Sequence, residues 1–599
     1  MTTSSGSTPI AEIPANTADA GEQLEMHLYQ VRWKHAVLLV VLVIHVWLLA
    51  RQGIVNAPNL DESAHLPAGY SHWQFGNFTL YRVNPPLIRM WAALPLLVDP
   101  PQTDWTSFSD GIFSRAEFTV GAAFCDVNGQ QTFRYFTLAR WMLIPVSILG
   151  ALVCYRWAFE LFGQNSALLA LCLWCFCPHL LAWGASITPD TGAAAFGVLA
   201  AWRFRRWLMQ PTWWNATIAG LTLGLAELTK SSWIILFGLW PLIWCCWRLT
   251  PKSVILAIPA SRQLCLILVL AVYLLNLGYG FEGSGQQLRD FTFVSRTLGG
   301  EAAHTDGGNR FRDSWVGNLP VPVPANYLRG IDLQKHDFER GKWSYLRGEQ
   351  KEGGWWYYYL YAILVKTPVG FLMLIGVATG LFISSHRYRC GWRDEMMLIL
   401  PGLAIIVLVS SQTGFNRYLR YVLPAFPYLY IFASRAAIAF RQRSRLLSAT
   451  IMFLLVAGIV SSLSVFPYSM SYFNMAVGGP AGGRYHLLDG NLDWGQDLLR
   501  FRDWVDRHPD ATPLYTALTT FVPLESAGIQ SEPIRPSHDG VIRPLDPGWY
   551  AISVNHLMGY KLHGSDRPEC MQFQKMEPSE KIGDSIYLYR VQEEPLSQD

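Results

Sequence analysis

The sequence predicts an α-helical polytopic membrane protein with about eleven transmembrane helices and a small α+β domain at its C-terminal end. Of its 599 residues, 51% are hydrophobic and only 15% are charged, a balance that does not suit an ordinary soluble protein. Its 25 Trp and 26 Tyr fit this class, because amphipathic rings collect where hydrocarbon meets lipid headgroups. After residue 467 the long apolar runs give way to a soluble pattern.

Eleven apolar stretches approach membrane length, once flanking residues that tilt or snorkel are allowed for. They lie near residues 33–51, 138–160, 165–185, 190–208, 215–230, 233–247, 264–280, 364–384, 395–411, 420–438 and 446–466. Several are shorter than the ~20 residues that cross a bilayer, so the count holds to within about two. Residues 1–32 form a polar tail, and no small-residue cleavage site follows the first span, which predicts that this span is retained.

The basic residues predict the orientation of the chain. Those between the spans fall on the same side as the N-terminal tail: Arg203, Arg205, Arg206, Arg248, Lys252, Arg262, Arg387, Arg389, Arg393, Arg435, Arg441, Arg443 and Arg445. The positive-inside rule makes this side cytoplasmic. The segments 52–137, 281–363 and 467–599 are then outside, in the periplasm or extracellular space beyond the cell (inner) membrane, and residues 33–466 form the transmembrane domain.

Residues 467–599 are numerous enough for a core of their own. The segment "DWGQDLLRFRDWVDRHP" has a helical pattern, whereas "GWYAISV" and "SIYLYRV" alternate like strands. In "DGNLDWGQDLL" we expect Asp493 as the N-cap and Gln496 at N3 of a capping box. Because this explains the motif structurally, we assign no catalytic role to it.

Seven of the ten cysteines lie in apolar spans, where Cys behaves as a small hydrophobe: Cys154, Cys172, Cys175, Cys177, Cys245, Cys246 and Cys265. A zinc site in "CLWCFCPH" would need thiolates inside lipid and a further ligand such as His179, which disfavours it. Cys125 and Cys570 fall in polar outer segments, so a disulfide between them stays open.

Asp61 and Glu62 stand side by side in "NLDESAHLPAGYSHW", directly after the first span. As a helix start, they would stabilise its N-terminus by about 0.3 to 1 kcal/mol. As a functional site, two acids with His65 one turn later form a concentrated polar cluster beside the bilayer. The residues alone leave both interpretations open.

Asp190 in "SITPDTG" has a stronger structural explanation, with Thr188 as N-cap, Pro189 at N1 and Asp190 at N2 of a helix. A capping role is therefore favoured on local grounds. Its position on the same outer face as Asp61 keeps it a candidate site residue.

Four basic residues lie at the outer ends of spans. Lys230 ends a helix in "GLAELTKSS" and Lys366 opens one in "LVKTPVG", where each has the option of snorkelling to the interface. Arg417 lies in the short outer loop "QTGFNRYL" and Arg420 just after it, on the wrong side for positive charge and without neighbouring acids. Such a ring suits a lipid-linked phosphate, although simple contact with lipid headgroups explains Arg420 nearly as well.

Five segments in order carry a resemblance to a known family: "DESAHLPAGYSHWQFGNFTLYRVNPPLIRMWAALPLL", "GLAELTKSS", "YLRGEQKEGGWWYYYLYAILVKTP", "NRYLRYVLPAFP" and "YFNMAVGGPAGGRYHLLDGNLDWGQDL". They resemble glycosyltransferases of the GT-C class, specifically the family 39 group of protein mannosyltransferases, aminoarabinose transferases and bacterial phospholipid carrier-dependent glycosyltransferases. The last segment is typical of the bacterial subgroup. The likeness covers most of the chain.

The resemblance implies a GT-C-like fold and transfer of a hexose or pentose from a polyprenyl-phosphate carrier to a lipid, glycan or protein acceptor on the outer face. By the family pattern, the acidic pair maps onto Asp61 and Glu62, and a later outer acid onto Asp190. Relatives often have His-Pro-Pro where this chain has Asn84-Pro85-Pro86, so an acceptor role borrowed from that His has no counterpart here. Some members of the class bind a divalent cation at these acids and others do not.

We therefore expect Asp61 to act as general base, with Glu62 and Asp190 orienting the acceptor or binding a cation. His65 is expected to contact the substrate. Lys230, Lys366, Arg417 and Arg420 would hold the carrier phosphate. No Gly-rich nucleotide loop is evident, which agrees with a lipid-linked donor. The expected partners are this donor, membrane lipids and an acceptor that the sequence does not identify, and no nucleic acid is expected.

A transporter or flippase of a lipid-linked phosphate or sugar is the main alternative, because it would use the same positive ring. Such proteins tend to show broken helices near mid-membrane and inverted halves, and the sequence indicates neither. A membrane anchor that carries residues 467–599 as a binding module is a third interpretation, which does not explain the charges at the outer helix ends.

Overall fold

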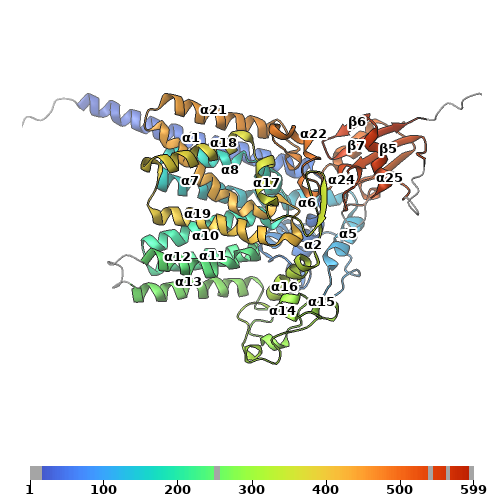
Figure 1. Cartoon of the computed structure of the whole chain (residues 1–599), viewed down its shortest axis with the longest axis horizontal. Coiled ribbons are helices and arrows are strands. Elements are labelled where there is room, and N and C mark those ends of the chain that lie inside the picture. Colours follow the sequence, from blue (N-terminus) through green and yellow to red (C-terminus); the bar gives the residue numbers. More distant parts are fainter. Residues whose placement is uncertain (1–16, 249–256, 537–543, 562–566, 593–599) are drawn as a thin grey trace, which may run out of the picture.

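A computed structural model of the chain describes residues 17–248, 257–536, 544–561 and 567–592. Figure 1 shows a bundle of helices running side by side, with a sheet-containing domain and several shorter elements gathered at one end. These shorter elements come from the three segments expected on one side of the membrane, 52–137, 281–363 and 467–599. These elements make one end of the bundle the elaborate end, and at the other end several of the described helices are joined by short turns.

Every expected span falls on helical structure. The bundle contains α1 (Thr17–Val55), α7 (Ile144–Phe162), α8 (Gln164–Cys175), α9 (Pro178–Gly184), α10 (Pro189–Met209), α11 (Trp213–Thr229), α12 (Ile235–Arg248), α13 (Ala257–Gly278), α17 (Tyr358–Lys366), α18 (Val369–Ser384), α19 (Trp392–Ser411), α20 (Phe426–Ser434) and α21 (Arg445–Leu463). Helix α1 begins within the polar tail, so residue 33 marks a change of polarity and no break in secondary structure.

Among the described residues, six helical stretches are long and apolar enough to cross a membrane, or eight if two bent pairs each count as one span. The bends are 57° between α8 and α9 and 114° between α17 and α18. Each falls at a residue that precedes proline, Cys177 or Thr367, where an extended conformation replaces the helical one. The other three of the eleven expected spans are α10, which carries four charges, and α11 and α12, which have 17 and 14 residues.

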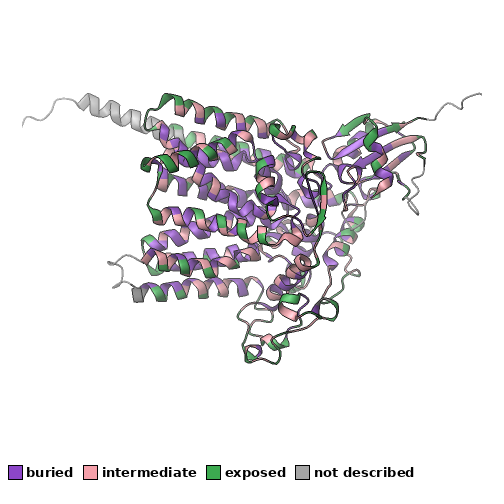
Figure 2. Ribbon diagram, viewed as in Figure 1, coloured by how far each residue is buried: buried purple, intermediate pink, exposed green. Residues whose placement is uncertain are grey.

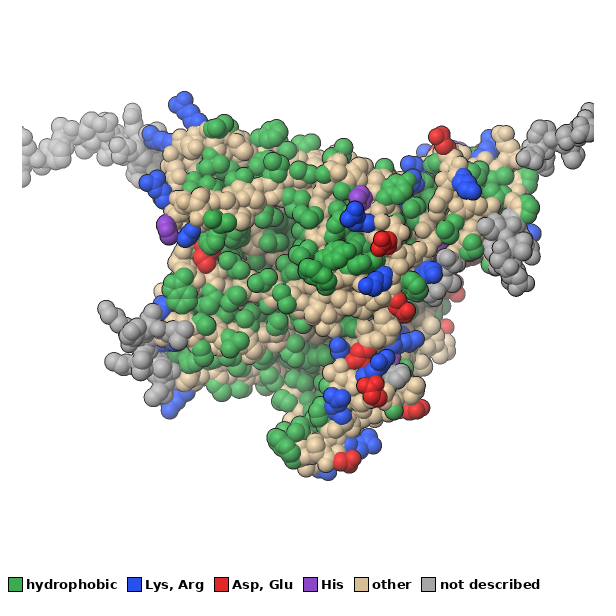
Figure 3. All heavy atoms as spheres, viewed as in Figure 1, with side chains coloured by type: hydrophobic (Ala, Val, Ile, Leu, Met, Phe, Trp, Pro, Cys, Tyr) green, Lys and Arg blue, Asp and Glu red, His purple; other side chains and the backbone are tan. Residues whose placement is uncertain are grey.

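The flanks of the bundle are apolar. Buried residues line the interior, while exposed ones lie on the outward helix faces (Figure 2). Figure 3 shows hydrophobic side chains covering the visible flank, with charged side chains gathered toward its two ends. An exposed apolar belt of this size marks a surface in contact with lipid, so the chain is a multi-pass membrane protein.

Helix α2 (Leu60–Phe75) packs between α3 (Leu87–Ala92) and α5 (Ala116–Asn128), near α4 (Leu94–Val98) and α6 (Gln131–Trp141). Two glycines permit this approach. A Cβ at Gly69 would lie 2.1 Å from the Arg89 carbonyl oxygen, and one at Gly121 would lie 2.4 Å from that of Ser63. Any side chain at either position would push α2 away from its neighbours.

The segment 281–363 contains the short helices α14 (Arg296–Gly299) and α15 (Ala303–Asp306), the longer α16 (Ala325–Arg340), and a hairpin of β1 (Trp343–Leu346) and β2 (Glu349–Glu352). In the C-terminal domain, a five-stranded sheet has the order β4 (Glu532–Pro533), β3 (Leu514–Ala517), β5 (Gly548–Ser553), β7 (Ile586–Val591) and β6 (Glu580–Ile582). The helices α22 (Gly479–Gly483), α23 (Leu498–Arg507), α24 (Val554–Leu557) and α25 (Pro568–Met571) accompany it. Strands β5 and β7 are the two that the sequence predicts, and the α+β prediction is confirmed.

The predicted start of the helix in "DWGQDLLRFRDWVDRHP", with Asp493 as its N-cap, is wrong. Helix α23 begins at Leu498, and the preceding Asp493 and Gln496 lie in a loop. Asp493 accepts a hydrogen bond from the backbone N–H of Gly495 at 3.2 Å, and Gln496 donates to the Leu492 carbonyl oxygen at 3.0 Å. Gly495 has a φ of +85°, a left-handed conformation that interrupts a right-handed helix.

Cys125 in α5 and Cys570 in α25 are both buried free thiols. The disulfide that the sequence leaves open is therefore not formed between them. Both thiols belong to the hydrophobic core, where Cys behaves as a small apolar side chain.

Candidate active site

A cavity of about 460 Å³ opens at the elaborate end of the bundle, between the helix ends and the outer elements. Of the residues that the structure describes, six cationic side chains line it, Arg115, Lys230, Arg340, Lys342, Arg417 and Arg420, together with three carboxylates, Asp61, Asp190 and Asp337. The formal excess of positive charge favours an anionic ligand.

The start of α2 separates the roles of Asp61 and Glu62. Glu62 closes a capping box with Asn59, in which each side chain accepts a backbone N–H of the other at 3.1 Å. Its carboxylate also accepts from the Arg140 guanidinium at 2.6 and 2.8 Å and from the Ile187 N–H at 2.9 Å. Glu62 is fully buried and does not line the cavity, so it fixes the helix start and cannot orient an acceptor directly.

Asp61 lies one residue earlier, about 100° around the helix, and lines the cavity. Its Oδ2 accepts from the Arg420 guanidinium and, at 3.3 Å, from the indole N–H of Trp494. Of the adjacent acids, the structure therefore brings only Asp61 to the place where a ligand would bind.

Asp190 occupies N2 of α10 after Thr188 and Pro189, as the sequence predicts. The Thr188 side chain makes no capping hydrogen bond. The Asp190 carboxylate instead pairs with two positively charged side chains. It accepts from Lys230 Nζ at 2.6 Å and from Arg420 at 3.4 Å. Arg420 thus joins Asp61 and Asp190, and Lys230 continues the chain of alternating charges.

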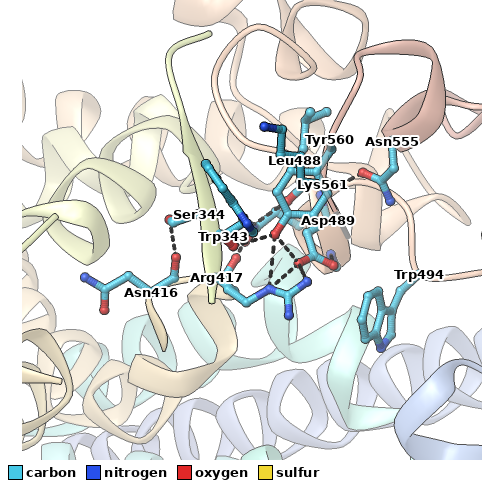
Figure 4. Close-up of polar contacts among 12 residues, drawn as sticks. Trp343, Ser344, Asn416, Arg417, Leu488, Asp489, Trp494, Asn555, Tyr560 and Lys561 are labelled. Carbon is cyan, nitrogen blue, oxygen red and sulfur yellow. Dashed lines mark hydrogen bonds and ion pairs between the residues drawn. The ribbon is translucent and has the colours of Figure 1, made fainter. Parts of the chain in front are cut away.

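Arg417 and Arg420 flank Tyr418 at the start of a 3₁₀ segment, Leu419–Ala425. In Figure 4 the Arg417 guanidinium faces the Asp489 carboxylate, which it contacts at 2.5 and 2.6 Å, and the Tyr560 hydroxyl lies 3.1 Å from its Nε. The expectation that these arginines lack acidic neighbours is wrong in space, because Asp489, Asp61 and Asp190 arrive from distant segments. Arg420 is buried in the cavity wall, which rules out simple contact with lipid headgroups.

Lys366 does not reach the cavity, which corrects its expected place in the phosphate site. Its Nζ donates to the Met470 carbonyl oxygen at 3.0 Å and to that of Asn491, and it lies 4.4 Å from the centre of the Phe473 ring. The break before Pro368 ends α17 here, and the segment after α21 covers the ammonium group. Lys366 therefore anchors the C-terminal domain to the bundle.

His65 lines the cavity, stacked on Tyr81 with ring centres 4.3 Å apart. Burial lowers the pKa of His65 well below its usual value, and the nearby Arg89 and Arg420 guanidinium groups lower it further. Arg89 donates to the Tyr81 and Asn84 carbonyl oxygens, which holds this loop against the cavity. Asn84, at the position where relatives often have His, lines the cavity too.

Several lining residues were not singled out from the sequence. Arg340 and Lys342 are positive charges in an outer segment. As with Arg417, a positive charge on the outer side indicates a candidate binding residue. Trp494 belongs to the motif that we interpreted as a helix start, and no local pattern indicates that it reaches Asp61.

A second cavity, of about 370 Å³, adjoins the first and shares Lys230, Gln334, Phe338, Phe415 and Tyr421 with it. Its remaining wall is largely apolar and includes Ile234, Ile331, Leu408 and Val409. A charged cavity and an apolar one thus meet at Lys230, at the end of the membrane-spanning helices.

Asp61, Glu62 and Asp190 do not fit a divalent cation site. Such a cation needs several unpaired oxygen ligands, yet Arg420, Lys230 and Arg140 already neutralise these acids. Within the described parts of the chain, no group of three or more His, Cys, Asp or Glu side chains is placed to hold a metal.

The fold and the cavity define a polytopic membrane protein with a charged cavity at one end of its helix bundle. The family model described as dolichyl-phosphate-mannose-protein mannosyltransferase matches residues 120–282, which include Asp190 and Lys230. This match supports the resemblance to the family 39 group over that part of the chain. No curated protein matches the chain.

Similar solved structures include ArnT from Cupriavidus metallidurans bound to undecaprenyl phosphate, with 12% identity, a TM-score of 0.43 and coverage of 93% of this chain and 97% of that one. They also include the oligosaccharyltransferase AglB from Archaeoglobus fulgidus, in complex with an inhibitory peptide and a dolichol-phosphate. That structure is 12% identical, with a TM-score of 0.40 and coverage of 95% and 75%. At these identities and TM-scores, the likeness assigns no role to any residue of this chain.

Proposed function

We propose that the chain is a membrane glycosyltransferase that moves a sugar from a polyprenyl-phosphate carrier to a lipid, glycan or protein acceptor. The observation that carries this proposal is the junction of the two cavities at Lys230. A lipid-linked phosphate has an anionic head and an apolar tail, and these cavities offer matching surfaces side by side. The family match at residues 120–282 supports the same class of donor.

The phosphate would lie among Lys230, Arg417 and Arg420, with the first isoprene units in the apolar cavity. Arg417 and Arg420 both line the cavity while they keep their carboxylate partners. Arg340 and Lys342 add positive charge to the cavity wall. Cations fixed in position before the reaction stabilise the charge that develops on a leaving phosphate without having to reorganise.

The reaction needs one proton acceptor. An acceptor group attacks the anomeric carbon of the sugar, the bond from that carbon to the phosphate oxygen breaks, and the phosphate leaves with the electron pair. We choose Asp61 as the general base because it lines the cavity. Its carboxylate would take up the proton of the acceptor. Asp190 holds Lys230 and Arg420 in place, and Glu62 positions Asp61 by fixing the start of α2.

The donor sugar is a hexose or a pentose in this proposal. The cavity end faces the periplasm or extracellular space beyond the inner membrane, and the N-terminus is cytoplasmic. The basic residues of the short turns at the opposite end of the bundle support this orientation.

Mass spectrometry of membrane lipids, glycans and envelope proteins tests the proposal, in cells with and without the gene. We expect one glycosylated product to depend on the gene and to vanish with Asp61→Asn, with the protein still in the membrane. Full product formation by Asp61→Asn contradicts the assigned base. If no glycosylated product changes but the distribution of lipid-linked phosphate across the membrane does, the transporter alternative replaces the transferase.

A further inference from the structure

The motif "LLDGNLDWGQDLL" lies outside the transmembrane bundle, yet every residue from Leu487 to Leu498 is buried. Asp489 contacts Arg417, and Asn491 accepts a hydrogen bond from the Leu419 N–H at 3.0 Å. The segment is therefore fastened to the part of the chain that carries both cavity arginines.

The other side of the segment is fastened to the C-terminal domain. The side chain of Asn555 accepts from the Asp489 N–H at 2.8 Å and donates to the Asp493 carbonyl oxygen at 3.0 Å. Asn555 belongs to α24, which directly follows strand β5. The loop between Asp489 and Trp494 thus has a fixed shape, set by partners on both sides.

Trp494 projects from this loop to the cavity. Its indole N–H donates to Asp61 Oδ2 at 3.3 Å, the same oxygen that receives Arg420. Its ring packs against Tyr418 and Phe521, with ring centres 5.1 and 5.5 Å away. Among the described residues, both of these bonds fall on Oδ2, which leaves Oδ1 as the oxygen for an acceptor group.

We propose that Trp494 is a positioning residue, whose indole N–H holds the Asp61 carboxylate so that its second oxygen meets the acceptor. The C-terminal domain then completes the active site and is more than an attached binding module. This inference rests on the proposed glycosyl transfer. Arg420 alone would hold Oδ2 but would leave the carboxylate free to rotate into a two-oxygen pair with the guanidinium.

The chain supplies a matched control in Trp504. This second tryptophan lies in the same domain, is equally buried at 2% exposure, and donates its indole N–H to the Glu580 carboxylate at 2.9 Å. It does not line the cavity. Trp494→Phe and Trp504→Phe therefore each remove one hydrogen bond from an indole N–H to a carboxylate in the same domain. Only the bond of Trp494 is made to Asp61.

The experiment compares both variants of the full chain with the parent chain in two readouts. The first readout is binding of undecaprenyl phosphate, measured as the shift in melting temperature that this lipid causes. Product formation in cells is followed by mass spectrometry. Trp494→Phe should keep the undecaprenyl phosphate shift and lose about tenfold or more in product, because misplacing a reacting group is costly. Trp504→Phe should change neither.

Equal product from Trp494→Phe and the parent chain would overturn the inference while leaving the proposed function intact. Absence of any gene-dependent product from the parent chain sinks the proposed function itself, and the inference with it. If Trp494→Phe is unstable, Trp494→Met fills the site with a flexible apolar side chain that has no N–H, and it must show the same separation of binding from product. Instability of both variants would assign Trp494 to packing.

Discussion

Arg417 and Asp489 form a buried ion pair across 72 positions of sequence, with Arg417 Nη2 2.5 Å from Asp489 Oδ2. The pair joins the loop before a transmembrane segment to the C-terminal domain. Through it, a residue proposed to bind phosphate is already held by a carboxylate of the chain itself.

Removing one partner of this pair should destabilise the chain. Arg417→Gln and Asp489→Asn each leave an uncompensated buried charge, which costs about 3 to 5 kcal/mol. The double variant removes both charges and should regain most of the melting temperature, yet it should still bind undecaprenyl phosphate weakly, since Arg417 is missing. A double variant that binds as the parent does would remove Arg417 from the phosphate site.

Arg417→Lys should give partial activity. Lysine keeps the positive charge but lacks the planar fork that contacts a carboxylate and a phosphate at once. We expect product formation between that of the parent and that of Arg417→Gln, measured by mass spectrometry at equal protein levels. Lysine and glutamine variants of equal activity would indicate that charge at this position is irrelevant to transfer.

The neighbours Asp61 and Glu62 should fail in different ways. Asp61→Asn should fold and bind undecaprenyl phosphate normally but lose about 10² to 10⁴ in turnover, as expected for loss of a general base. Glu62→Gln should lower the melting temperature, because it weakens the buried pair with Arg140. A stable Glu62→Gln chain with no activity would return Glu62 to the chemistry.

Cysteines introduced at exposed serines test the orientation. Ser109 and Ser579 lie at the elaborate end, and Ser444 lies in the turn between α20 and α21 at the opposite end. In intact cells, an impermeant thiol reagent should label Ser109→Cys and Ser579→Cys, while Ser444→Cys should react only after lysis. The parent chain serves as the blank for its native thiols. Labelling of Ser444→Cys alone would invert the topology. Ser537, another choice on sequence grounds, lies outside the described residues.

Asp493 predicts a pH dependence of stability. Burial raises the pKa of Asp493 to about 7, and the nearby Asp497 carboxylate raises it as well. The folded state therefore favours the protonated acid, so its contribution is full below the unfolded pKa of about 3.9 and is lost as pH rises toward 7. Asp493→Asn should flatten the fall in melting temperature over this window. An unchanged slope would show that Asp493 does not titrate as described.

Local patterns predicted much of the fold. Apolar stretches of membrane length located helices at every expected span, and alternation located β5 and β7. The start of α23 was misplaced because the sidechain pattern of a capping box fits Asp493 and Gln496, while the left-handed Gly495 prevents a helix from running through them.

The sequence by itself determined the class of protein, the spans, and a short set of candidate charges on one face, since these depend on hydrophobicity and periodicity along the chain. Only the tertiary structure decided how those charges are used. It turned Glu62 toward Arg140 and Asp61 toward Arg420, and it covered Lys366 with the C-terminal domain. It also brought Asp489 to Arg417 and Trp494 to the cavity. The physical reason is that ion pairs and hydrogen bonds act over a few ångströms in space, between residues that lie tens to hundreds of positions apart in sequence.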